Sequence, residues 1–171
     1  IHRAYVNAGA QIVYANTFGA NREKLSHCGQ TVEKLISAAI SIAKEAAGDR
    51  ALVALDIGPT GQLLEPTGTL DFETAVDIFA QVVKAGAEAG ADLIAIETMT
   101  DLQEARAALL AAKEHSNLPV LATMTYEATG RTFLGCSPAC AALTLEGMGA
   151  DAIGINCSLG PREMPPLVEK L

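Results

Sequence analysis

Cys157 stands in the part of the chain that is richest in chemically useful side chains. It belongs to the motif Gly-Ile-Asn-Cys-Ser-Leu-Gly-Pro at 154–161, directly after a short apolar run and next to Asn156. A thiolate at the end of a strand can bind a metal ion or act as a nucleophile. The alternative is a small buried core residue, which is the usual environment of a free cysteine. Asn156 either orients a ligand or satisfies backbone groups of the loop.

Two carboxylates also follow apolar segments. Glu97 ends a run of hydrophobic residues, and because burial of a lone carboxylate is costly, it must be exposed at a rim or paired. There it can bind the ammonium group of a substrate, or it can form a salt bridge with a neighbouring residue. Asp56 occupies the equivalent position in Asp-Ile-Gly-Pro-Thr-Gly at 56–61. That loop lacks the Lys-Ser/Thr of nucleotide-binding P-loops, so phosphate binding has little support.

The remaining cysteines and the histidines give no complete set of metal ligands. Cys136 and Cys140 show a Cys-x-x-x-Cys spacing, which is near metal-ligand spacing, but no second pair accompanies them. A thiol at a helix start, together with a thiol that faces the core, is the better interpretation. Cys28 is isolated in a loop, and the histidines at 2, 27 and 115 do not have the spacing of helical metal-binding motifs.

A nine-residue phrase that occurs three times indicates how these side chains are positioned. Its copies lie at 9–17, 90–98 and 149–157, and each consists of a helix end, a short apolar strand and two polar or reactive residues. The copies end in Asn16-Thr17, Glu97-Thr98 and Asn156-Cys157, respectively. Such a repeat predicts parallel strands that all present their chemistry at one rim.

The surrounding pattern alternates strands and helices along the whole chain. We expect strands at 12–16, 51–57, up to Glu97, 120–126 and 152–156. Between them we expect helices at 32–47, from Asp71 to Gly90, from Asp101 onward and from Ser137 to about Gly147, with a further helix before the first strand and another from Pro161. Glu104, three residues after Asp101, is expected to complete a variant of the capping box at the start of that helix. The strands are nearly continuous apolar runs, which is typical of parallel strands covered on both faces. The segment 17–29 is predicted to be a polar loop.

Two α/β architectures fit this alternation, a doubly wound open sheet and a closed barrel. No GxGxxG motif follows the first strand, so a dinucleotide-binding fold has no direct support. Polar residues at the ends of all five strands favour a (β/α)8 TIM barrel, whose strands feed one active-site face. A full barrel needs about 250 residues and eight strands. We therefore expect 1–171 to be the central part of one barrel domain, a partial barrel of about five parallel strands truncated at both ends.

Composition and charge limit the classes of partner and the cellular compartment that are expected for the protein. The net charge of −8 and the pI of about 4.8 argue against nucleic acid and anionic membranes as main partners. No apolar run reaches the roughly 18 residues of a transmembrane helix, and no signal segment opens the chain. The four cysteines are too unevenly spaced for a secreted disulfide scaffold, which favours a reducing, cytoplasmic compartment.

Four motifs in this order resemble the homocysteine S-methyltransferase domain. They are Ala-Asn-Thr-Phe-Gly-Ala-Asn at 15–21, the 56–61 motif, Ile-Glu-Thr at 96–98 and the 154–161 motif. The resemblance covers essentially the whole chain and is strongest to the N-terminal, homocysteine-binding module of cobalamin-dependent methionine synthases. It implies a barrel with a catalytic zinc held by three cysteines, one of which matches Cys157. The other two form an adjacent pair further along the family's chain, and this sequence has no adjacent cysteines.

The resemblance also implies where L-homocysteine binds. Glu97 matches the family's glutamate that contacts the substrate amino group. We expect four further strand-end residues to line the same substrate site: Asn16, Thr17, Asp56 and Asn156. The family's first strand, with an acidic and glycine-rich end that contacts homocysteine, is expected to precede Ile1. The three other cysteines match no family ligand.

The implied reaction moves a methyl group to the thiol of L-homocysteine and gives methionine. The homocysteine sulfur enters an open coordination position of Zn²⁺, loses its proton and attacks an electrophilic methyl group. In methionine synthases the donor is methylcobalamin, and cobalamin and folate modules belong to the same longer chain. Related enzymes use S-methylmethionine or betaine, and the sequence leaves the donor open. A non-catalytic barrel fragment that needs a partner chain is an alternative, and an aldolase-type barrel is disfavoured because no strand ends in lysine.

Overall fold

Five strands and seven helices make up the chain, and a computed structural model describes all residues from 1 to 171. The strands are β1 (Ile12–Tyr14), β2 (Leu52–Ile57), β3 (Leu93–Met99), β4 (Val120–Met124) and β5 (Ala152–Ile155). The helices are α1 (His2–Asn7), α2 (Arg22–Leu25), α3 (Val32–Ala47), α4 (Phe72–Glu88), α5 (Leu102–His115), α6 (Pro138–Gly147) and α7 (Pro165–Val168). None of the helices is both long and apolar enough to cross a membrane.

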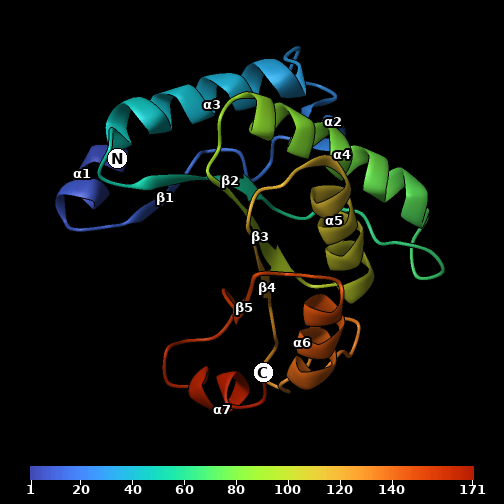
Figure 1. The fold of residues 1–171 in the computed structure, drawn as a ribbon. Helices are drawn as coiled ribbons and strands as arrows, with labels where there is room; N and C mark the ends of the chain where they lie inside the picture. Colours follow the sequence, from blue (N-terminus) through green and yellow to red (C-terminus); the bar gives the residue numbers. More distant parts are fainter.

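The strands form one parallel sheet in the order β1-β2-β3-β4-β5, the order in which they occur along the chain. A doubly wound sheet reverses its strand order at a switch point, and this sheet has none. Helices α3, α4, α5 and α6 follow one another around the same side of the curved sheet (Figure 1). This singly wound arrangement is that of a (β/α)8 barrel, so the expected partial barrel of five strands is confirmed.

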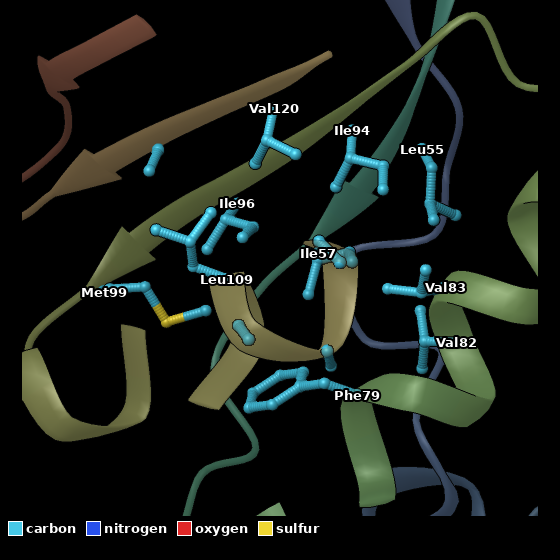
Figure 2. Close-up of a cluster of buried hydrophobic side chains, with 14 of the residues drawn as sticks. Leu55, Ile57, Phe79, Val82, Val83, Ile94, Ile96, Met99, Leu109 and Val120 are labelled. Carbon is cyan, nitrogen blue, oxygen red and sulfur yellow. The ribbon is translucent and has the colours of Figure 1, made fainter. Parts of the chain in front are cut away.

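The two faces of the sheet bury different kinds of side chain. One face carries large aliphatic residues that pack against α4 and α5, where Phe79, Val82, Val83 and Leu109 meet them (Figure 2). We call the opposite face, which these helices leave free, the inner face. Because side chains alternate along a strand, the inner face receives the residues between the large aliphatic ones. On this inner face, Ala54, Leu93 and Ala95 form a separate small hydrophobic cluster, and Tyr14 packs on it.

The helix starts follow from capping residues that are visible in the sequence. Asp71, Asp101 and Ser137 each accept a hydrogen bond from a backbone N–H in the first turn of α4, α5 and α6, respectively. Thr31 does the same for α3, and Gly48 ends α3 with a φ of 54°. The predicted helix at 32–47 is confirmed, and α3 has the same first and last residues as predicted.

Three local predictions were wrong. The predicted loop 17–29 contains the short helix α2, whose N-cap Asn21 accepts from the Lys24 N–H. The last helix begins at Pro165 and not at Pro161, because 161–164 form a turn. Glu104 was expected to close a capping box with Asp101, but its carboxylate instead accepts hydrogen bonds from Thr60 in the loop after β2.

Two copies of the repeated phrase have an aspartate at the third position, Asp92 and Asp151. Both form hydrogen bonds at the end of the sheet opposite the rim. Asp92 accepts hydrogen bonds from the Val53 N–H at 2.6 Å and from Lys44 Nζ at 2.6 Å. Asp151 accepts from the Val120 N–H at 2.8 Å and from Lys113 Nζ at 2.8 Å. In both cases the aspartate joins the start of the preceding strand to the end of the helix before it. We call this arrangement the aspartate clamp.

Candidate functional site

The carboxyl ends of the strands bring Asp56 and Glu97 together on the inner face. Asp56 on β2 is in register with Ala95 on β3, so Glu97, two residues further along β3, is its diagonal neighbour on the same face. None of the ion pairs in the chain involves either carboxylate. The salt bridge considered as the alternative for Glu97 is therefore not formed.

The surroundings of these two carboxyl groups disfavour negative charge. Asp56 is 8% exposed, and its Oδ1 atom has no hydrogen-bond partner. Burial, followed by the nearby charge of Glu97, raises the pKa of Asp56 to about 7. Burial also raises the pKa of Glu97, while burial and both carboxylates raise the pKa of the Tyr14 phenol. Two unpaired acids side by side on one face of the sheet suit a ligand that brings a positive charge.

Asn16 and Thr17 at the end of β1 have different environments. Asn16 is exposed and lines a hollow of about 760 Å³ together with Tyr14 and Asp56. Thr17 is 2% exposed, and its hydroxyl donates to the Asp56 carbonyl at 2.8 Å and accepts from the Asp56 N–H at 2.9 Å. Thr17 thus ties the end of β1 to β2. Its predicted contact with a substrate stays a prediction, as does that of Asn16.

Asn156 forms a hydrogen-bonded bridge between three strand ends. Its Oδ1 accepts from the Thr98 N–H at 3.0 Å and from the Thr123 hydroxyl at 2.9 Å. Its Nδ2 donates to Thr98 Oγ1 at 2.8 Å and to Cys157 Sγ at 3.4 Å. We call these contacts the Asn156 bridge. They connect the ends of β3 and β5 across β4 and place the Cys157 sulfur next to Thr98, at 3.6 Å from Thr98 Oγ1.

The backbone at this rim is locally strained. Thr98, Cys157 and Ser158 have φ values of 61°, 60° and 62°, and they are the only residues other than glycine with positive φ. The register between β3 and β4 shifts between Ile96 and Met99, so one extra residue of β3 forms a bulge at Glu97-Thr98. Strained residues and bulges cluster at functional sites, because the surrounding structure must hold them in place.

Cys157 is the candidate metal ligand, and its thiol is exposed at the rim. An exposed thiol with neutral hydrogen-bond donors beside it can become a thiolate ligand, so its chemistry fits one position of a zinc site. No group of three His, Cys, Asp or Glu side chains in the chain is arranged to hold a metal ion. Cys136 precedes the N-cap of α6 and is half-buried against the core, whereas Cys140 in the first turn and Cys28 are exposed.

The loop after β2 is anchored by a buried glutamate. Glu104, on the first turn of α5, is 3% exposed, and its Oε1 accepts from the Thr60 N–H at 2.7 Å and from the Thr60 hydroxyl at 2.6 Å. Gly58 at the start of this loop lies against Phe18, where a methyl group would overlap the aromatic ring. These contacts fix the loop that follows Asp56 and hold the β2 end of the site in place.

Sequence reasoning assigned no role to three residues of this site, although Thr98 belongs to the repeated phrase. Tyr14 faces the two carboxyl groups, Thr98 contacts both Asn156 and Cys157, and Thr123 contacts Asn156. The alternation of side chains along a strand points to Tyr14, because it lies two residues before Asn16 and must share its face. The bulge that turns Thr98 toward Asn156 has no comparable signal in the sequence.

Comparison with known proteins gives a consistent result. The family model for homocysteine S-methyltransferases matches residues 1–171. The chain is 32% identical to methionine synthase of Mycobacterium tuberculosis and 31% identical to methionine synthase of Mycobacterium leprae, in each case over 96% of the chain. It spans 15% of the length of these two relatives.

Among solved structures, the fold matches the homocysteine methyltransferase MmuM from Escherichia coli. The metallated form superposes with a TM-score of 0.84 at 21% identity, over 96% of this chain and 63% of that one. The apo form of the same enzyme gives a TM-score of 0.77 at 22% identity. At this identity the match supports the fold. Since the family model covers every residue, the chain belongs to the homocysteine S-methyltransferase family.

Proposed function

We propose that the chain is the homocysteine-binding part of a methyltransferase that converts L-homocysteine to methionine. The observation that carries this proposal is the presence of two complementary groups at one rim. Asp56 and Glu97 offer unpaired carboxyl groups for an ammonium ion, and Cys157 offers an exposed thiol for a metal that binds sulfur. Homocysteine carries an ammonium group at one end and a thiol at the other. Family membership supports the same substrate.

In this proposal Cys157 is one of the zinc ligands, and the two further cysteine ligands lie outside residues 1–171. Bound zinc supplies the chemistry that makes a thiol nucleophilic at neutral pH, because a coordinated thiol is held as a thiolate. The residues of this chain bind and orient the substrate: Glu97 and Asp56 take the ammonium group, and Asn16 lines the hollow beside them. Thr98 and Asn156 hold the Cys157 sulfur at the rim.

We propose methylcobalamin as the methyl donor, carried on another module of a longer chain together with a folate module. Two facts support this choice: the curated relatives at 32% and 31% identity are named methionine synthase, and the chain spans 15% of their length. The alternative donors are S-methylmethionine and betaine. The similarity to MmuM bears on the fold and does not favour any of the three donors.

The test is an assay of methionine formation with the full-length protein that contains this chain. Zinc-loaded protein is incubated with L-homocysteine and, separately, with methylcobalamin, S-methylmethionine or betaine. We expect methionine with methylcobalamin. The Cys157→Ala variant should lose both zinc and turnover, whereas Cys28→Ala, which removes another exposed thiol, should keep both. Absence of methionine with all three donors would refute the proposed function, and formation with another donor would correct the donor.

For the 171-residue chain alone we expect weak zinc binding and no turnover, because it supplies one of three proposed thiolate ligands. Zinc binding is measured by competition with a chromophoric chelator. Tight zinc at one equivalent per chain would contradict the proposed ligand set. Size-exclusion chromatography of the same sample tests the alternative of a fragment that needs a partner chain, since open strand edges favour association.

A further inference from the structure

Every hydrogen-bonding position of the Asn156 side chain is already used by the protein. A carboxamide offers two acceptor positions on oxygen and two donors on nitrogen. In Asn156 the acceptors are taken by the Thr98 N–H and the Thr123 hydroxyl, and the donors by Thr98 Oγ1 and Cys157 Sγ. No position remains for a bound ligand, so Asn156 acts on the site through its neighbours.

These neighbours flank the two groups that are proposed to contact the substrate. Thr98 directly follows Glu97, and Cys157 directly follows Asn156. The Asn156 bridge therefore sets how far the Glu97 carboxylate on β3 lies from the Cys157 sulfur on β5. Strand β4 lies between these two strands, and its Thr123 hydroxyl also supports the bridge by donating to Asn156 Oδ1 at 2.9 Å.

The bridge also opposes the tendency of this backbone to relax. Thr98 and Cys157 both occupy the left-handed region, which non-glycine residues avoid. Thr98 is held there by two hydrogen bonds with one carboxamide: its N–H donates to Asn156 Oδ1 at 3.0 Å, and its hydroxyl oxygen accepts from Asn156 Nδ2 at 2.8 Å. Without them the bulge at Glu97-Thr98 is free to shift along β3, and the carboxylate and the sulfur lose their fixed separation.

We propose that Asn156 is a positioning residue that sets the length of the amino acid accepted by this site. The inference rests on the proposed function: a ligand is held by its ammonium group near Glu97 and by its sulfur near Cys157. A fixed separation between these two points selects the number of methylene groups in between. L-homocysteine has one methylene more than L-cysteine. A difference of one methylene typically gives about 10- to 200-fold discrimination.

The test measures binding, which does not depend on a methyl donor. Dissociation constants for L-homocysteine and L-cysteine are determined by calorimetry on the full-length, zinc-loaded protein and on four variants. Asn156→Ala removes the whole bridge. Asn156→Asp keeps the acceptor for the Thr98 N–H but cannot donate to the sulfur. Thr123→Val removes one supporting contact and leaves Asn156 in place. Thr125→Val is the matched control, because its hydroxyl donates at 3.1 Å to the backbone carbonyl of Asn156 and not to its side chain.

We expect the wild type to prefer homocysteine by at least about tenfold. Both Asn156 variants should bring the two dissociation constants to within about threefold of each other, with an intermediate ratio for Thr123→Val. Thr125→Val should keep the wild-type ratio even if its stability falls. A preserved ratio in the Asn156 variants, or an equal loss in Thr125→Val, would overturn the positioning role while the proposed function stands. Failure of the wild type to bind homocysteine would overturn both.

Discussion

Replacing Asp56 with asparagine should make the protein more stable at pH 8 and leave its stability nearly unchanged at pH 4. Asp56 is 8% exposed, its Oδ1 has no partner, and Glu97 is its neighbour on the same face. Burial and the Glu97 charge raise its pKa to about 7 from 3.8. The folded protein therefore favours the neutral acid, which asparagine resembles in shape and charge.

The sign of the effect follows from this shift. Because the pKa is raised on folding, the stability that Asp56 contributes is fully present below about pH 3.8 and is lost as the pH rises through about 7. A difference of about 3 pKa units corresponds to about 4 kcal/mol at 1.36 kcal/mol per unit. The rim is open to water, which screens the charge, so we expect Asp56→Asn to gain about 2 kcal/mol at pH 8.

The assay is urea unfolding of the parent and the variant at several pH values between 4 and 8, followed by circular dichroism. The free energies of unfolding should converge at low pH and separate as the pH rises toward 8. Glu97→Gln is the matched comparison, since burial raises the pKa of Glu97 in the same direction. Parallel pH profiles, or a variant less stable than the parent at pH 8, would show that Asp56 is ionised and paired, and would refute the reasoning.

Two further predictions concern the framework that holds the site. Gly86→Ala should lower the free energy of unfolding by about 1–3 kcal/mol, because a methyl group there overlaps the fully buried side chain of Leu55 on β2. Gly147→Ala, at an open position at the end of α6, should instead raise it by about 0.5 kcal/mol in the same unfolding assay. Glu104→Ala should cost about 2–3 kcal/mol because it leaves two buried donors of Thr60 unpaired, whereas Glu104→Gln, which retains an acceptor, should cost far less. Equal losses in both Glu104 variants would show that Thr60 does not depend on this acceptor.

The sequence was sufficient to predict the order of the strands and of the longer helices, and the rim on which the site lies, whereas the short helix α2 was missed. Capping residues such as Asp71 and Ser137 are local signals, and the helices begin where these signals place them. The apolar runs predicted five parallel strands, and the polar residues at their ends predicted the rim. The repeated phrase predicted equivalent positions for Glu97 and Asn156, which both lie at the rim.

Contacts between distant segments could not be predicted in the same way. Glu104 has the spacing of a capping box with Asp101, but the loop after β2 brings Thr60 closer, and two hydrogen bonds from Thr60 outweigh one from the helix start. The Asn156 bridge depends on the bulge in β3, which results from the register with β4 and not from any residue type in the phrase. The orientation of the Cys157 side chain therefore could not be predicted from the sequence and is seen only in the structure.

The aspartate clamp has a consequence for recombining this protein with its relatives. One clamp joins α3, β2 and β3 through Asp92, and the other joins α5, β4 and β5 through Asp151. The part of the chain from α3 to β5 thus consists of two consecutive two-strand units, each held together by the same kind of clamp. A chimera whose crossover lies between β3 and α5 takes each clamp whole from one parent. In a chimera with a crossover between β2 and α4, Lys44 and Asp92 come from different parents, so their ion pair forms only if both parents carry the matching residue. For the clamps, the segment between β3 and α5 is therefore the better crossover, and contacts that still cross it, such as those of Thr60 with Glu104 and of Thr98 with Asn156, must then match between the parents.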